Sequence, residues 1–180
     1  MIASDIHGSA YWCRKLLDRF HAEKADRLLI SGDILYHGPR NDLPLEYDPK
    51  AVISLLNPLK DLLLCVRGNC DSEVDQMVLE FPIMAEYAFL SIDGIDIFAT
   101  HGHKYGSDNP PPHSKGTVLL CGHTHLPKIS EHETYTYINP GSISIPKEGS
   151  PNSYMIFENG LFSWRDMNGK EYMTFRADRK

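Results

Sequence analysis

Five short apolar runs in this 180-residue chain each end beside a glycine and an aspartate, asparagine or histidine. The clearest predicts a strand over residues 27–31, followed at once by Gly32 and Asp33. An apolar run of this length before a turn signal is typical of a buried strand, and open α/β sheets gather their ligand-binding side chains at the strands' carboxyl ends. The five groups are Asp5-Ile6-His7, Gly32-Asp33, Gly68-Asn69, His101-Gly102 and Gly122-His123-Thr124-His125. Alone, each polar residue would more often be structural or exposed, but the repetition predicts one shared site.

Helices and strands alternate in the first half of the chain, and strands dominate the second half. The predicted helices run from a cap at Ser9 to Lys24, over residues 50–56 behind Asp48-Pro49, and from a cap at Asp71 or Ser72 to Val78 or Leu79. Strands are predicted over residues 1–4, 27–31, 62–66, 87–92, 95–99, 118–121, 128–131, 135–138, 153–157, 161–165 and 172–175. This order predicts a mixed α/β fold, and the length favours a single domain over residues 1–180.

Composition and charge argue against several classes of protein. A net charge of −6 argues against a broad nucleic-acid-binding face, which needs clustered Lys and Arg. No stretch has the apolar length of a membrane span, and no signal peptide is recognised. The four cysteines form no CxxC pair, and Cys65 and Cys121 lie in apolar runs where a buried thiol is expected. We therefore expect a reduced cytoplasmic protein.

The polar groups at the strand ends are typical ligands of divalent metal ions. Together they offer two carboxylates, four imidazoles and one amide: Asp5, His7, Asp33, Asn69, His101, His123 and His125. Such donors favour Mn, Fe, Zn, Co or Ni. Seven donors exceed one tetrahedral zinc but suit two ions ~3.5–4 Å apart that share a bridging carboxylate. Residues two apart on an extended tail face the same way, so Asp5 with His7, and His123 with His125, are predicted to act as pairs.

These motifs resemble those of the calcineurin-like metallophosphoesterase superfamily. The resemblance rests on Asp5-Ile6-His7-Gly8, Gly32-Asp33, Gly68-Asn69-Cys70-Asp71, His101-Gly102-His103, Gly122-His123-Thr124-His125 and Asn139-Pro140-Gly141-Ser142. Residues 32–41 and 67–77 resemble the YfcE-type bacterial phosphodiesterases in particular. The likeness covers nearly the whole chain and is weakest after Tyr154. Relatives usually carry a few more residues before Ala3, so a short first strand is expected.

The resemblance implies a two-sheet β-sandwich flanked by helices, with two metal ions at one edge. One ion would take Asp5, His7, Asp33 and His125, and the other Asp33, Asn69, His101 and His123. Asp33 would bridge them, and Mn²⁺ is the expected working metal. The implied reaction is attack of a metal-bridging hydroxide on a small phosphodiester, with Asn69, His101 and His103 as the residues that take part in catalysis.

One position departs from the superfamily pattern. The residue after the metal-binding asparagine is usually a histidine that protonates the leaving oxygen, and here it is Cys70. A thiol is a weak general acid, so we expect a preference for good, aryl-like leaving groups. His103 and His37 are alternative helpers, Arg40 and Arg67 could meet phosphate or form structural ion pairs, and the Asn139–Ser142 turn is expected to support the His125 loop.

Other classes of protein compete with this hypothesis. The same fold serves in the retromer as a protein-interaction scaffold, so a catalytically weak scaffold is the main alternative. A protein phosphatase would carry Asp-Arg-Gly after Gly32-Asp33, which is absent here, and a nuclease would need a nucleic-acid platform. A structural zinc site from Cys65, Cys70 and Cys121 fits no zinc-module spacing. A homo-oligomer remains open.

Overall fold

The computed structural model describes residues 1–178 and follows the expected order of elements. Its helices are α1 (Ala10–Ala22), α2 (Pro49–Leu56), the 3-10 helix η1 (Asn57–Leu62) and α3 (Glu73–Gln76). Its strands are β1 (Ile2–Ala3), β2 (Leu28–Ile30), β3 (Leu63–Cys65), β4 (Tyr87–Ile92), β5 (Ile95–Thr100), β6 (Thr117–Leu120), β7 (Pro127–Glu131), β8 (Tyr135–Pro140), β9 (Ser153–Glu158), β10 (Leu161–Asp166) and β11 (Glu171–Arg176).

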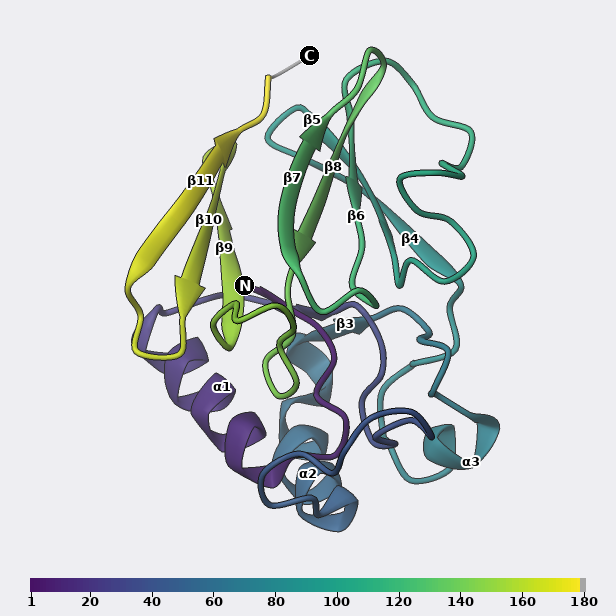
Figure 1. Cartoon of the computed structure of the whole chain (residues 1–180), viewed down its shortest axis with the longest axis vertical. Coiled ribbons are helices and arrows are strands. Elements are labelled where there is room, and N and C mark those ends of the chain that lie inside the picture. Colours follow the sequence, from purple (N-terminus) through teal and green to yellow (C-terminus); the bar gives the residue numbers. More distant parts are fainter. Residues whose placement is uncertain (179–180) are drawn as a thin grey trace.

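The strands form two mixed sheets, which confirms the predicted fold class (Figure 1). One sheet has the order β11-β10-β9-β1-β2-β3, in which β1, β2 and β3 run parallel. The other has the order β4-β5-β6-β8-β7, in which β5, β6 and β8 run parallel. In both sheets the remaining strand pairs are antiparallel.

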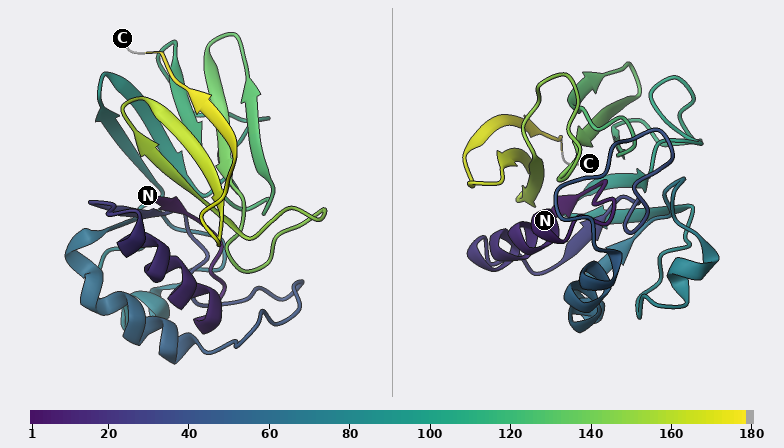
Figure 2. Two further views of the ribbon diagram at one scale, coloured as in Figure 1. Left: turned by 90° about the vertical axis from the view of Figure 1, so that its left-hand side faces the viewer. Right: turned by 60° about the horizontal axis from the view of Figure 1, so that its bottom comes forward.

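The core lies in layers on both faces of the six-stranded sheet. Leu29 faces a cluster between the two sheets that includes Ile97 and Trp164. Its neighbours Leu28 and Ile30 face the other way, into a cluster shared with α1 and α2. Because β2 is buried on both faces, its sequence is a continuous apolar run instead of an alternating one. Figure 2 shows α1 and α2 together on one side of the molecule, with most strands on the other.

The caps of α1 and α2 follow the predicted signals. The Trp12 backbone N–H donates to Ser9 Oγ at 3.3 Å, and the Ala51 N–H donates to Asp48 Oδ1 at 3.0 Å. The 3-10 helix η1, which has Pro58 in its first turn, was not predicted. Proline is tolerated in the first turn of a helix, so the chain starts a new 3-10 turn there instead.

Two other elements differ in extent from their predictions. Ser72, and not Asp71, caps α3, in a capping box with Asp75. That helix ends at Gln76, short of the predicted Val78 or Leu79. Strand β8 continues through Asn139 and Pro140, which were expected to begin a turn, because both pair with β7. In the described part of the chain, no helix is both long and apolar enough to cross a membrane.

Candidate metal centre

The loops that follow β1, β2, β3, β5 and β6 meet at one edge of the sandwich, and they bring all seven predicted ligands together. The Asp5 N–H donates to the Gly32 carbonyl at 3.2 Å, and the Gly122 N–H donates to the His101 carbonyl at 2.8 Å. These backbone bonds join loops that are far apart in the sequence. Parallel strands end at a common edge, so the repetition of the motif places the side chains at one point.

The backbone at the ligands corrects one prediction. Five of them have left-handed φ values between 50° and 68°: Asp5, His7, Asp33, His123 and His125. This conformation costs roughly 1–3 kcal/mol for each non-glycine residue. The tails after β1 and β6 are therefore not extended, and His123 does not pair with His125. The two histidines instead point into different groups of donors.

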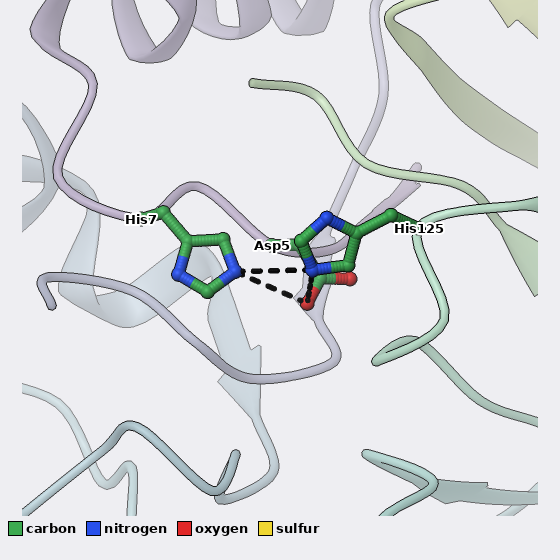
Figure 3. Close-up of side chains that lie close together, drawn as sticks. All are labelled: Asp5, His7 and His125. Atoms are coloured by element: carbon green, nitrogen blue, oxygen red, sulfur yellow. Dashed lines mark hydrogen bonds and ion pairs between the residues drawn. The ribbon is translucent and has the colours of Figure 1, made fainter. Parts of the chain in front are cut away.

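The first group contains Asp5, His7 and His125, all nearly fully buried (Figure 3). Asp5 Oδ1 lies 3.6 Å from His7 Nε2 and 3.3 Å from His125 Nε2. The two Nε2 atoms are 3.2 Å apart. Figure 3 shows the carboxylate and both rings turned toward the same small space.

The second group contains Asp33, His101 and His123, with Asn69 beside them. Asp33 Oδ2 lies 3.3 Å from His101 Nε2, which is 3.1 Å from Asn69 Oδ1. The rings of His101 and His123 are 5.0 Å apart. Asp33 Oδ2 also lies 3.6 Å from His7 Nε2, so this carboxylate borders both groups.

Backbone carbonyls fix the orientation of three imidazoles. The Nδ1 atoms of His7, His101 and His125 lie 2.7, 2.6 and 2.7 Å from the carbonyl oxygens of Tyr36, Ser31 and Ile145. A carbonyl only accepts, so each Nδ1 is the protonated nitrogen. Each Nε2 is then available as a metal ligand, and an Nδ1–H to carbonyl bond of this kind is the usual support of a metal-binding histidine.

This arrangement fits divalent cations. Asp5 Oδ1 is buried and accepts no hydrogen bond of ordinary geometry from residues 1–178. Two Nε2 lone pairs 3.2 Å apart repel unless a cation or a proton lies between them. The donors are oxygen and imidazole nitrogen, which suit Mn, Fe, Zn, Co or Ni. Asp5, His7, Asp33 and His125 would hold one ion, and Asp33, Asn69, His101 and His123 the other.

Carboxylates and imidazoles perturb each other strongly in this site. Burial raises the pKa of Asp33, but contact with His101 outweighs burial and leaves that pKa below its usual value. Burial lowers the pKa of His101, but the Asp33 and Asp5 carboxylates together outweigh burial and raise that pKa to about 9. In the same way, the pKa of Asp5 lies below its usual value and the pKa of His7 lies above its usual value. Without a cation the carboxylates draw protons onto the imidazoles, so metal binding must release protons.

Polar residues outside the seven hold the loops in place. As expected of the Asn139–Ser142 turn, Asn139 Nδ2 donates to the Gly122 carbonyl at 2.6 Å and to Thr124 Oγ1 at 3.1 Å. The hydroxyls of Ser142 and Ser144 donate to the Asp5 carbonyl at 2.9 and 2.7 Å. Ser144 was not among the predicted site residues, although its spacing from Ser142 places both hydroxyls beside one loop.

Asp71 is a second residue whose role the sequence did not reveal. It was considered as a helix cap, but its carboxylate is buried and accepts three backbone hydrogen bonds from the loops after β2 and β3. Each of its partners except Gly68 is almost forty residues away. No local pattern identifies such contacts.

The other candidate residues differ in their distance from the donors. The ring of His103 lies 5.4 Å from that of His101, its buried Nδ1 has no hydrogen-bond partner within residues 1–178, and burial lowers its pKa.

His37 packs edge-on against Tyr36 and Tyr47, outside both groups. Arg67 is held by Glu73 and Glu86, as a structural ion pair would be, and the exposed Arg40 forms no ion pair within residues 1–178.

The cysteines do not form a separate zinc site. Cys65 and Cys121 are buried, as predicted, and within residues 1–178 neither belongs to a group of potential metal ligands. Cys70 lies with His7 and Asp33 in a third such group. Burial, followed by the Asp33 charge, raises the pKa of the Cys70 thiol to about 12, so the thiol is protonated at neutral pH.

An apolar cavity of about 660 Å³ lies away from these donors, near the start of β2 and β3. Leu29, Leu63, Ile97 and Phe157 line it, and none of the seven ligands does. The polar chemistry is therefore confined to the opposite, carboxyl ends of the strands.

Comparisons with known proteins show the family and the fold of the chain. The chain is 46% identical over 174 residues to phosphodiesterase YfcE of Escherichia coli strain K12, covering 97% of this chain and 95% of that protein. A solved structure of E. coli YfcE superposes with a TM-score of 0.95 at 42% identity, covering 99% and 98% of the two chains. Zinc-bound Vps29 of Entamoeba histolytica, at 17% identity, shares the fold with a TM-score of 0.60 over 97% of each chain. The model of the calcineurin-like phosphoesterase superfamily domain matches residues 1–160. The chain therefore belongs to the calcineurin-like phosphoesterase superfamily.

Proposed function

We propose that this protein is a phosphodiesterase that works with two divalent metal ions and hydrolyses small phosphodiesters. The observation that carries the proposal is the position of Asp33, whose Oδ2 borders both groups of imidazole and oxygen donors. The name of its E. coli relative, phosphodiesterase YfcE, supports the same class of reaction. We propose Mn²⁺ as the working metal, since oxygen and imidazole donors suit it.

The seven ligands would bind the cations, and the net charge of the metal-loaded site would attract the substrate. When bound, two divalent ions supply Lewis acidity, lower the pKa of a water held between them and attract phosphoryl oxygens. Among the seven ligands only Asp5 and Asp33 carry negative charge, so two doubly charged cations leave the site positive. A phosphodiester anion is therefore attracted to it.

Within residues 1–178, the thiol that lies among these donors is Cys70, in a group with His7 and Asp33. Its raised pKa of about 12 keeps it protonated at neutral pH, so it is not an ionised nucleophile. The same thiol would be a poor proton donor to a leaving oxygen, because its acidity is far too low. We therefore propose that the preferred substrates have leaving groups that need no proton, such as aryl oxides.

His103 is the side chain that remains to assist the leaving group. It lies beside the second group of donors, and its Nδ1 has no hydrogen-bond partner in residues 1–178. Burial lowers its pKa, so most of it is neutral at pH 7, and it would donate a hydrogen bond more readily than a proton. Its help would therefore be modest, which agrees with a preference for good leaving groups.

The cytoplasm is the proposed setting. All four cysteines are free thiols, and Cys13, Cys65 and Cys121 are buried, as in proteins of reducing compartments. We propose a small diester as the substrate, with no role for nucleic acid or membrane, since the net charge of −6 gives no broad basic surface. A homo-oligomer is compatible with this proposal.

The test is an assay of metal-free protein reconstituted with Mn²⁺, Zn²⁺, Co²⁺ or Ni²⁺. We expect hydrolysis of a bis-aryl phosphodiester that exceeds hydrolysis of the matching aryl phosphomonoester, with Mn²⁺ most effective. Asp33→Asn is the control and should abolish the activity. Full occupancy by two ions without turnover of either substrate would overturn the proposal in favour of a protein-interaction scaffold.

A further inference from the structure

The buried carboxylate of Asp71 joins the two loops that carry Asp33 and Asn69. Its Oδ2 accepts the Asp33 N–H at 2.8 Å and the Gly68 N–H at 2.7 Å. Its Oδ1 accepts the Ile34 N–H at 2.8 Å. Asp71 is only 2% exposed and forms no ion pair within residues 1–178, so these backbone N–H groups are the donors to its carboxylate.

The two loops exchange hydrogen bonds in both directions. While Asp71 accepts from the Asp33 loop, the Cys70 N–H donates to Asp33 Oδ1 at 2.8 Å. This bond occupies Oδ1 and leaves Oδ2 facing His7 and His101. The choice of which oxygen lies between the two groups of donors thus depends on how closely the loops approach.

The two loops are so close that neither Gly32 nor Gly68 has room for a side chain. A Cβ on Gly68 would lie 2.0 Å from Asp33 Oδ1, and a Cβ on Gly32 would lie 2.6 Å from the Gly68 nitrogen. Asp33 itself is left-handed, with φ of 56°, and its carbonyl accepts the His7 N–H at 2.9 Å. Both peptide groups of Asp33 are therefore held, one by Asp71 and one by the first ligand loop.

We propose that Asp71 is a positioning residue of the metal centre, which keeps Asp33 Oδ2 between the two cations and Asn69 within reach of the second. The proposal rests on the proposed function, since it assumes that two cations bind. The first group has supports of its own, because Ser142 and Ser144 hold the Asp5 carbonyl. Loss of Asp71 should therefore weaken the second cation more than the first.

The variant Asp71→Asn keeps the size of the side chain but removes one acceptor. If the amide oxygen takes the Asp33 and Gly68 N–H groups, the amide nitrogen faces the Ile34 N–H, donor against donor. We expect the affinity for the second Mn²⁺ to fall about 10- to 100-fold, as for other outer residues that orient metal ligands. Calorimetric titration and elemental analysis give the stoichiometry. Electron paramagnetic resonance distinguishes a coupled Mn²⁺ pair from an isolated ion.

Asp75→Asn is the matched control. Asp75 also accepts a backbone N–H, that of Ser72 at 2.8 Å, but it completes the capping box of α3 and makes no hydrogen bond to the Asp33 loop within residues 1–178. We expect it to lower stability while the coupled pair is retained. If Asp71→Asn does not fold, Asp71→Ser is measured in the same way.

Two results separate this inference from the proposed function. A folded Asp71 variant that binds both ions with wild-type affinity and wild-type coupling overturns the positioning role and leaves the proposed function intact. A wild-type protein that never binds a pair of ions overturns the proposed function itself. Loss of the second ion in the Asp71 variant, with both ions retained in Asp75→Asn, is the expected result.

Discussion

At the scale of single residues, Asp33 differs from the other six proposed ligands because one of its oxygens borders both groups of donors. Its Oδ2 lies 3.3 Å from His101 Nε2 and 3.6 Å from His7 Nε2, whereas Asn69 Oδ1 lies beside His101 in the second group. The backbone of Asp33 is left-handed, and the loops after β1 and β3 hold both its peptide groups and Oδ1. A substitution there should affect two ions, whereas a substitution at an outer ligand should affect one.

We predict that Asp33→Asn weakens both metal sites and that His7→Ala weakens mainly one. The amide lacks the negative charge that attracts two cations. Loss of a residue that only orients a metal ligand lowers metal affinity about 10- to 100-fold, and we expect both affinities to fall further than that in Asp33→Asn. Mn²⁺ titration of the two variants gives the stoichiometry and both affinities. Loss of a single ion in each variant would show that Asp33 is an ordinary ligand.

The second prediction at this scale concerns Cys70→His. An imidazole at this position can protonate an alkoxide leaving group, and general acids contribute about 10²–10⁴-fold. The turn at Gly38 lies close by, since a Cβ there would be 3.3 Å from Cys70 Sγ, so the larger ring must displace this turn. We expect the rate on alkyl phosphodiesters, relative to aryl ones, to rise about 10-fold or more. Cys70→Ser is the control, and an unchanged ratio in Cys70→His would contradict the role given to this position.

At the scale of elements, the proposed ligands lie in loops that follow short strands, and hydrogen bonds from other loops fix the positions of these loops. Strands β1, β2 and β3 are only 2, 3 and 3 residues long, so the ligand loops begin almost at once. The end of β8 is one such support, because Asn139 binds the loop between β6 and β7 that carries His123 and His125. Its own carbonyl accepts the Trp164 Nε1–H at 2.7 Å, which ties this support to the other sheet.

We predict that Asn139→Ala destabilises the protein by about 1–3 kcal/mol, since it leaves the buried Gly122 carbonyl without its side-chain donor. The same change should weaken metal binding, because His123 and His125 lose their anchor. Asp48→Ala is the control, since it removes the side-chain cap of α2 at a cost of about 1 kcal/mol and keeps the backbone bond from the Asp48 N–H to the Gly8 carbonyl. Chemical denaturation and Mn²⁺ titration measure the two effects, and equal metal affinities in both variants would contradict the prediction.

Local signals predicted the elements well where one segment decides its own structure. The caps at Ser9 and Asp48, the Asp93-Gly94 hairpin and the apolar run of β2 all follow from neighbours in the sequence. The cap of α3 was ambiguous because Asp71 and Ser72 are equally good caps by type. Backbone donors from the distant loop after β2 bind the Asp71 carboxylate, and Ser72 caps the helix.

At the scale of the whole molecule, the metal centre links folding to pH. Without metal, the raised pKa values of His7 and His101 stabilise the fold below pH 6.5, and this stabilisation is lost as the pH rises through about 9, the pKa of His101. The lowered pKa values of Asp5 and Asp33 act in the other direction, and their contribution is lost only as the pH falls below about 4.

We predict that the melting temperature of the metal-free protein falls as the pH rises from 6.5 towards 9, and that Mn²⁺ removes or reverses this trend. Cations replace the protons on Nε2, so metal stabilisation grows with pH. A change of about 1 kcal/mol corresponds to about 2–4 °C for a domain of this size. Calorimetric scans with chelator and with Mn²⁺ measure both trends, and parallel curves would contradict the linkage.

The sequence by itself determined the class of fold and the positions of seven donors, because both follow from local patterns: apolar runs, glycines and the polar residues behind them. Only the tertiary structure decided how the donors group. His123 and His125 separate into different groups because left-handed backbone turns them apart, and Asp33 borders both groups because Asp71 and Cys70 hold its loop from almost forty residues away. Such long-range bonds leave no periodicity in the sequence, so the structure was needed to show why one aspartate occupies the centre of the site.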